Sequence, residues 1–370
     1  MLIRIEDILE PCQIILSAVD VNDFAQVTKL VELDVKDSVL SMAVTNQEYV
    51  AQIKIPLDED VEFHATVDAQ TFLKLICSMT CDVIEFTIKD NVLIVKGNGV
   101  YKLPLVFDGD TMFKLPEIVI DNVQTELDVD GNVLNSLLTY NSRQFTSKSV
   151  YSLVNKYYYM DENGAITFTS GACVNSFSLS SPIKMLLNQR LVKLFKLFKE
   201  SAVHIAYGND VVGNDVIQSK AIFSANNIKI SSILTSDSSL INNVPVTAIR
   251  AMAEKIYPYS VNIDKAEVMA SLNRLQLFAN KNMLCYAEFN FKPQNCVVTF
   301  NHNVETIYYN NTDTGLTEDG YKTVLDMGEL QNILNGCIEP AVSVRFGDNK
   351  AVVIARKSVV DIMPEVHEVN

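Results

Sequence analysis

The sequence is poor in residues that could carry out chemistry. Its 370 residues include no tryptophan and only four scattered histidines, His64, His204, His302 and His367. None of them stands with a serine or cysteine in a nucleophile motif, and neither a Walker A nor a GxGxxG sequence is present. Acidic runs such as Asp58-Glu59-Asp60 fall in expected turns, where a solvated loop is the simpler interpretation. We therefore predict no catalytic residue, no cofactor and no enzymatic activity.

Long apolar runs are also missing. No segment approaches 18 consecutive apolar residues, so no membrane-spanning helix is expected. The opening MLIRIEDILEP has acids within its apolar stretch, which argues against a signal peptide.

The cysteines give no sign of a disulfide framework or a metal site. There are seven, an odd number without regular spacing, and they lie mostly in apolar segments. This usage predicts reduced, buried thiols in a cytoplasmic protein. Cys77 and Cys81 are four residues apart, but no second Cys/His pair accompanies them, so no metal site is predicted.

Positive charge is scarce. The chain has 30 Lys and Arg against 45 Asp and Glu, a net charge of −15, and a pI near 4.7. A protein that grips nucleic acid by affinity normally has a basic face and a high pI, so tight electrostatic binding to DNA is not expected. With 48% hydrophobic and 20% charged residues the composition is that of a globular protein, and its length suits two or three domains.

Internal repetition is the strongest feature that is present. Residues 66–104 are echoed by residues 323–364: each copy has Thr-Val, an Asp, a short amphipathic helix, an alternating strand, a polar turn with Asn, an apolar strand, and a closing strand ending in Pro. Asp68 and Asp326 are 258 residues apart, which leaves room for a middle copy. Residues 191–229 match it in order and element length. Repeats on this scale govern the fold.

The repeats predict three domains, 1–121, 122–244 and 245–370, each with two helices and about eight strands. Helices are expected over residues 6–19, about 131–140, 189–200 and 264–280, besides those of the repeat. Alternating strands need one covered face, so each domain should pack its two helices on one face of antiparallel sheet, an α+β fold. No linker is rich in Gly and Pro, which predicts domains that abut rigidly.

This order of elements resembles the bacterial and phage DNA polymerase III beta subunit, the DNA sliding clamp, over essentially the whole chain. Besides the repeat, VVDIMPEV (359–366) is similar to the family's closing strand, and Val154–Tyr159, Asn163-Gly164 and Thr169–Phe177 match the start of its middle domain. The resemblance implies a homodimer whose six domains close head to tail into a ring around double-stranded DNA, as a processivity factor. A ring held by topology needs no strong phosphate affinity, which fits the acidic composition.

The resemblance implies that basic residues on the helices and one loop face the DNA: Lys74, Arg143, Lys148, Arg190, Lys193, Lys196, Lys199, Arg274 and Lys281. Helix 6–19 departs from this expectation, because it carries Glu6, Asp7 and Glu10 and no lysine. The plainer interpretation, that the basic residues only solvate helix faces, stays open.

The resemblance also implies a pocket between the middle and last domains for short hydrophobic peptides of the replicative polymerase and the clamp loader. By position its walls are Val154, Ser170, Gly171, Ala172, Cys173, Val174, Pro245, Ile249, Met283, Ile362, Met363 and Pro364. Met and Pro suit adaptable peptide anchors. Cys173-Val174 replaces the family's usual His-Arg pair, and Glu365–Asn370 extends past the usual end, so the peptide preference should differ. Alternatively, Met363 and Pro364 merely end a strand.

A second hypothesis keeps the three repeats but not the DNA. The chain would then be a structural or scaffold protein, for instance a phage assembly component. Basic residues gathered on helices favour the clamp. Solution mass and retention on circular DNA distinguish the two.

Overall fold

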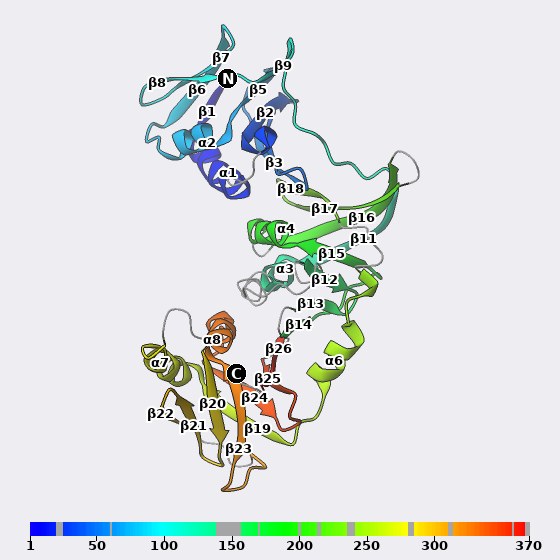
Figure 1. Cartoon of the computed structure of the whole chain (residues 1–370). Helices are drawn as coiled ribbons and strands as arrows, with labels where there is room; N and C mark the ends of the chain where they lie inside the picture. The colour runs from blue at the N-terminus through cyan, green and yellow to red at the C-terminus, as the bar shows by residue number, and fades with distance from the viewer. Residues whose placement is uncertain are drawn as a thin grey trace. The chain divides into compact units, whose positions relative to one another are not determined.

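The computed structural model describes residues 1–19, 25–59, 61–137, 157–168, 171–198, 201–212, 216–234, 241–279, 285–309, 314–356 and 359–366. In these ranges one pattern occurs six times: a strand, a helix, and a meander of three antiparallel strands (Figure 1). The three copies predicted from the sequence, residues 66–104, 191–229 and 323–364, are the second, fourth and sixth of these repeats.

The first two repeats occupy the start of the chain. The first consists of β1 (Leu2–Arg4), α1 (Ile5–Ala18), the short 3-10 helix η1 (Gln26–Lys29), β2 (Leu30–Lys36), β3 (Val39–Thr45) and β4 (Tyr49–Pro56). The second consists of β5 (Phe63–Asp68), α2 (Ala69–Cys77), β6 (Val83–Lys89), β7 (Val92–Lys96) and β8 (Val100–Pro104), followed by the short strands β9 (Phe107–Asp108) and β10 (Thr111–Met112).

The middle two repeats follow. They consist of β11 (Val123–Asp130), α3 (Gly131–Ser136), β12 (Tyr157–Asp161), β13 (Gly164–Phe168) and β14 (Ala172–Ser176), then β15 (Lys184–Asn188), α4 (Gln189–Leu194), the 3-10 helix η5 (Phe195–Phe198), β16 (Ala202–Val212), β17 (Val216–Ala225) and β18 (Ile228–Ile233). The helix predicted over 189–200 thus changes to 3-10 geometry after Leu194. The apolar residues of this segment are buried: Leu187, Leu191, Leu194, Phe195 and Phe198.

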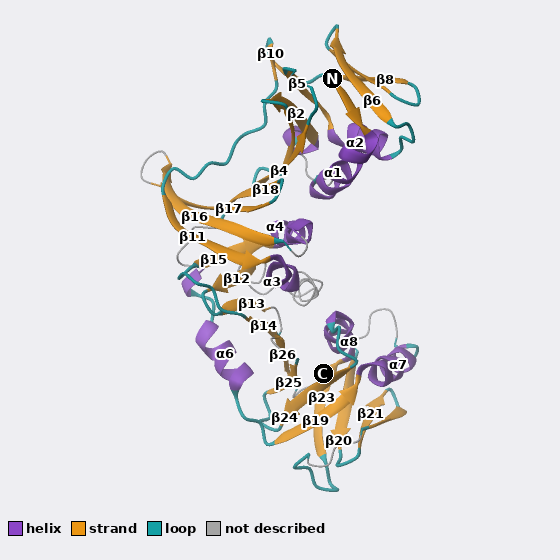
Figure 2. Cartoon of the chain, turned by 180° about the vertical axis from the view of Figure 1, so that it is seen from behind, coloured by secondary structure: helices purple, strands orange, loops and turns teal. Residues whose placement is uncertain are grey.

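The last two repeats are preceded by α6 (Val246–Glu254), a helix that the sequence reasoning missed. They consist of β19 (Tyr259–Asp264), α7 (Lys265–Gln276), β20 (Tyr286–Phe291), β21 (Asn295–Phe300) and β22 (Asn303–Tyr308), then β23 (Tyr321–Asp326), α8 (Met327–Gly336), β24 (Ala341–Phe346), β25 (Ala351–Ala355) and β26 (Val359–Pro364). In Figure 2, α7 and α8 lie side by side against these strands.

Opening strands are exchanged between neighbouring repeats. The first strand of each repeat pairs with the first meander strand of its neighbour, giving β1·β6, β5·β2, β11·β16, β15·β12, β19·β24 and β23·β20, all antiparallel. Two consecutive repeats are therefore interlocked by hydrogen bonds. The predicted α+β fold with antiparallel sheets is confirmed, whereas the domain boundaries at 121 and 244 stay a prediction.

Two pairings join meanders from different repeat pairs. β4 pairs with β18, and β14 pairs with β26, so four-stranded sheets merge into two sheets of eight strands. The described chain forms two compact units, residues 1–134 with 193–236 and residues 135–192 with 237–370, and each unit contains one of these eight-stranded sheets.

Asp or Asn caps five of the six repeat helices. A side-chain oxygen of the residue before the helix accepts a hydrogen bond from a backbone N–H of the first turn, at Asp68, Asp130, Asn188, Asp264 and Asp326. The exception is α1, where Arg4 makes no such bond. The repeated Asp of the sequence is thus a helix cap, because short polar side chains satisfy N–H groups that the helix leaves unpaired.

Removing one cap should cost little but measurable stability. We expect Asp326→Ala to lower the free energy of unfolding by about 1 kcal/mol, since the N–H groups of Gly328 and Glu329 lose their acceptor. Urea unfolding measures this loss. Asp326→Asn keeps an acceptor oxygen and should retain most of the stability, so an Asn variant as unstable as the Ala variant would contradict the capping role.

Candidate functional site

Two meanders end in strands without a partner among the described residues. The third meander strand is paired to another meander at β4·β18 and at β14·β26, but β8 and β22 end their sheets. Their side chains are correspondingly exposed: Val100 is 64% exposed on β8, and Val304 and Tyr308 are 60% and 66% exposed on β22. An edge strand offers unpaired backbone groups to another chain, and exposed apolar side chains add to that.

The end of α7 extends the apolar surface at β22. Leu277 and Phe278 follow the helix and are 80% and 54% exposed. They belong to the same neighbourhood, because α7 packs along β22 and the side chain of Asn301 donates a hydrogen bond to the Phe278 carbonyl at 3.2 Å. The helix predicted over 264–280 ends at Gln276, so Phe278 lies beyond it and is exposed.

Some of the predicted DNA-facing residues are exposed on helices. Lys74 on α2, Arg190 and Lys193 on α4, and Lys196 on η5 all point into solvent. Near Lys196, η5 lies on the sheet face that α1 also covers: the rings of Phe195 and Phe223 are 4.8 Å apart, and Cys12 of α1 contacts Met42 of β3. Arg143, Lys148, Lys199 and Lys281 lie outside the described residues.

Arg274 is placed differently from the lysines. Its guanidinium makes two hydrogen bonds of 2.7 Å to the carboxylate of Glu305 on β22. These bonds raise the pKa of Arg274 and lower that of Glu305, and they offset the positive charge locally. Arg274 is therefore held at the β22 edge by its pairing with Glu305.

The structure brings part of the predicted peptide pocket together in one apolar cluster. Ala172 and Val174 of β14, Ile362 of β26 and Ile249 of α6 share it with Val360, which the prediction had missed. Ala172 pairs with Ile362 and Val174 with Val360, so these four side chains point to the face that α6 covers. A groove of about 570 Å³ opens here, lined among others by Val174, Val246, Thr247, Arg250 and Val360.

Other predicted pocket residues lie elsewhere. Cys173 and Met363 alternate with the groove residues along their strands and point to the opposite face, Met363 into the core of the last two repeats. Pro245 is exposed at the start of α6, Pro364 is half-buried at the end of β26, and Gly171 lies against the Ile362 carbonyl. Val154, Ser170 and Met283 lie outside the described residues.

An ion pair ties α6 to the sheet beside the groove. Arg250 donates two hydrogen bonds to Asp161 of β12, at 2.8 and 2.6 Å, and the Asp161 side chain is 5% exposed. Burial by itself raises the pKa of Asp161, but the bonds from Arg250 and from the Asn163 N–H outweigh it and leave the pKa lowered. Alternation in the sequence could not reveal this pair, since its two residues are 89 positions apart.

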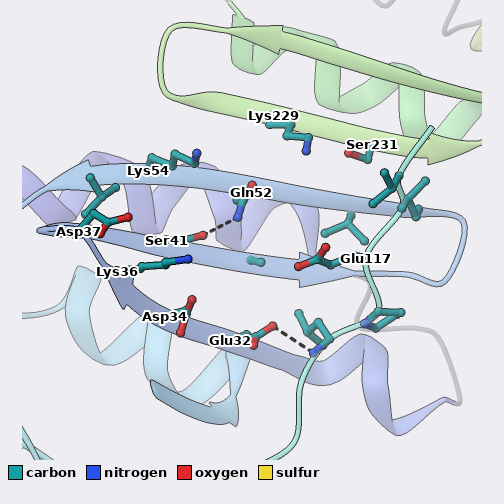
Figure 3. Close-up of a pocket in the computed structure, with 17 residues that line it drawn as sticks. Glu32, Asp34, Lys36, Asp37, Ser41, Gln52, Lys54, Glu117, Lys229 and Ser231 are labelled. Carbon is teal, nitrogen blue, oxygen red and sulfur yellow. Dashed lines mark hydrogen bonds between the residues drawn. The ribbon is translucent and has the colours of Figure 1, made fainter. Parts of the chain in front are cut away.

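The connection between the second and third repeats crosses the other eight-stranded sheet, on the face opposite α1 (Figure 3). A trough of about 470 Å³ opens beside it, with Lys54 and Lys229 on one side and Glu32 and Asp34 on the other. Glu32 accepts a hydrogen bond from the Leu115 N–H at 3.0 Å. This trough is polar and of mixed charge, unlike the apolar groove beneath α6.

No feature of a metal or redox site appears in the parts of the chain that the structure describes. No three His, Cys, Asp or Glu side chains there come close enough to hold a metal ion. The seven cysteines are free thiols, and burial raises the pKa of the Cys173 thiol well above its usual value. In the same residues no helix is long and apolar enough to cross a membrane.

Comparison with known proteins identifies the fold. No family model and no curated protein sequence matches the chain. Among solved structures, the DNA polymerase III subunit beta from Pseudomonas aeruginosa matches with a TM-score of 0.80 and 14% identity, over 100% of both chains. The DNA polymerase sliding clamp from Bacillus subtilis matches with a TM-score of 0.78 and 14% identity, over 100% of this chain and 99% of that one.

The chain thus has the fold of a DNA sliding clamp. Within that class it has the fold of the bacterial clamps, the DNA polymerase III beta subunits; that from Borrelia burgdorferi matches with a TM-score of 0.78 at 10% identity, over 99% of this chain and 98% of that one. The resemblance predicted from the sequence is confirmed at the level of the fold.

Proposed function

We propose that the protein is a DNA sliding clamp, a homodimeric ring that encircles duplex DNA and tethers the replicative polymerase. The proposal rests on how the third meander strands pair. We call a pairing between two such strands a joint; two joints are present, and two third strands lack a partner among the described residues. Each existing joint links the first repeat of one pair to the second repeat of the next pair, as β4·β18 and β14·β26. The two third strands left over are β22, from the first repeat of the last pair, and β8, from the second repeat of the first pair.

A third joint of the same kind requires two copies of the chain. β22 of one copy would pair with β8 of the next, antiparallel as in the other two joints. Such a head-to-tail contact closes into a ring only if the rotation it imposes brings the last copy back to the first; otherwise it yields filaments. Two copies with three repeat pairs each give six domains. We propose that the ring closes with these two copies.

Solution mass and retention on circular DNA test this function. We expect light scattering to give twice the chain mass of 41.3 kDa. Monomers diluted below the dissociation constant, then concentrated with nicked circular plasmid, should co-elute with it on gel filtration and be released when the plasmid is cut. A monomer at all concentrations, or binding that survives linearisation, would contradict a sliding ring.

Lys193 of α4 and Lys196 of η5, which are exposed on helices, are proposed to contact DNA phosphates. Each contact contributes about 0.9 to the slope of log affinity against log salt. At low salt, where weak binding to linear duplex that does not depend on encirclement can be measured by fluorescence anisotropy, Lys193→Gln with Lys196→Gln should therefore reduce that slope by roughly two. Lys36→Gln with Lys54→Gln, on the opposite sheet face, is the control; equal effects from both pairs would contradict the assignment.

The groove beneath α6 is proposed to bind short hydrophobic peptides of the polymerase and the clamp loader. Val246→Glu tests this, because Val246 lines the groove and begins α6, where an acidic residue favours the helix. We expect at least about tenfold weaker binding of a fluorescein-labelled apolar pentapeptide, with folding intact. Ile256→Glu, 93% exposed beyond the helix, should bind normally. Equal binding by Val246→Glu and the parent would remove the groove as the peptide site.

One observation favours the alternative of a scaffold without DNA. Acidic residues occupy the first turn of α1, and α8 carries no Lys or Arg. These two helices would therefore offer no lysine or arginine to DNA phosphates, and a ring would have to hold the DNA by encircling it. The plasmid experiment separates the two functions, since a scaffold would dimerise without being trapped on circles.

A further inference from the structure

The closing strand β26 is apolar on both faces. Val360 and Ile362 belong to the cluster beneath α6, whereas Met363 packs into the core of the last two repeats with Val352 and Ile354 of β25. β25 is itself buried at every position. Apart from Asp361, the β26 side chains on both faces are apolar, so the hydrophobic residues alone do not decide which set faces the groove. A slip of one residue would exchange the two sets.

One polar pair interrupts this apolar region. The side chains of Arg356 and Asp361 are each 1% exposed, and the guanidinium of Arg356 donates a hydrogen bond to the Asp361 carboxylate. Asp361 is also the register partner of Cys173 on β14, and the Cys173 thiol is hydrogen-bonded to its carboxylate. The pair therefore spans the hairpin of β25 and β26 and touches the neighbouring strand of the joint.

A buried carboxylate separated from its partner is strongly disfavoured, because nothing then compensates its lost hydration. In the observed register Asp361 lies between Arg356 and Cys173. After a one-residue slip it would point into the apolar cluster of Ile249 and Ala172 instead. The Arg356–Asp361 pair thus favours the observed register over the slipped one, whereas the apolar side chains of β26 fit either register.

We propose that the Arg356–Asp361 pair fixes the register of β26, so that Val360 lines the groove beneath α6 and Ile362 packs in the apolar cluster behind it, in place of Asp361 and Met363. Arg356 and Asp361 are both positioning residues on the sheet face away from the groove. The functional meaning rests on the proposed peptide groove, but the register can be measured without a peptide.

Thiol labelling reports the register directly. Val360→Cys and, separately, Met363→Cys are treated with N-ethylmaleimide, and each site is followed by peptide mass spectrometry, which separates it from the native cysteines. In the parent, Val360→Cys should react readily, because Val360 is half-buried at the groove, and Met363→Cys should stay protected, because Met363 is 1% exposed.

The pair is then replaced by apolar residues, Arg356→Met with Asp361→Leu. Such replacements often leave stability equal or higher. We expect an undiminished melting temperature together with labelling of Met363→Cys that is faster by at least about tenfold, as a slipped state becomes populated. The reversed pair, Arg356→Asp with Asp361→Arg, should restore protection.

The parent labelling pattern in the apolar variant would overturn the proposal. Leu272→Ala, at a fully buried position of α7, controls for general destabilisation: it should lower the melting temperature without changing the ratio of labelling at the two reporter sites. Failure of the peptide groove appears differently, as an intact labelling pattern in a protein that binds no apolar peptide.

Discussion

Replacing Tyr308 with aspartate is expected to give a folded monomer that no longer stays on circular DNA. Tyr308 is 66% exposed on the edge strand β22, so the change should be harmless within one chain. In the proposed joint it would bury a carboxylate without a partner. The dissociation constant should rise by at least about a hundredfold, measured by light scattering across a dilution series.

Val211→Asp is the matched control. Val211 is 68% exposed on β16, away from both free edges, so its dimer should equal the parent's. Val100→Asp on β8 should reproduce the loss seen with Tyr308→Asp, because each joint uses both strands. A Tyr308→Asp protein that dimerises like Val211→Asp would show that β22 takes no part in association.

Removing Arg250 should produce the largest loss of stability among changes beside the groove. Arg250→Met leaves the Asp161 carboxylate buried without its cation, and we expect the free energy of unfolding to fall by about 3 kcal/mol. Lys255→Met, just past the end of α6, breaks an ion pair whose lysine is 44% exposed. Its partner Asp348 is 9% exposed but keeps two backbone N–H donors, so the loss should be smaller, below about 1 kcal/mol. Urea unfolding compares the two; equal losses would contradict a structural role for the Arg250 pair.

This difference should depend on pH in a defined direction. The pKa of Asp161 is lowered in the folded protein, so its pairing stabilises fully above the unfolded pKa of about 3.9 and is lost as the pH falls through the folded pKa. The gap in stability between the parent and Arg250→Met should therefore be constant near neutrality and narrow below about pH 4. A gap that widens on acidification would contradict this sign.

The large-scale repeat could be predicted from the sequence because its signal is local. A start with Thr-Val and a nearby Asp, an amphipathic helix and alternating strands recur around Asp68 and Asp326, and the helix cap explains why the Asp recurs. The finer division into six repeats left a weaker trace, the single capping residues Asp130, Asn188 and Asp264. The sequence order alone could not show that opening strands are exchanged between repeats.

The groove was only partly predictable for a different reason. The family resemblance implied both Ile362 and Met363, but period-two alternation places only Ile362 on the groove face, together with Val360, which was not predicted. With apolar residues at both parities, the choice depends on Asp361 and Arg356, a long-range pairing across the hairpin. The helix α6 was not predicted because it lies outside the repeated pattern of strand, helix and meander that identified the other helices.

We propose that β8 of one copy pairs with β22 of the next and that this joint closes the ring. Val100→Cys with Val304→Cys, assembled on nicked circular plasmid and treated with a bis-maleimide, tests it most directly. If two β8–β22 joints close a ring, the dimer should be linked twice. It should stay on the plasmid through detergent and high salt and leave when the plasmid is linearised. A ladder of open oligomers, or a linked dimer that detergent strips from intact circles, would contradict it.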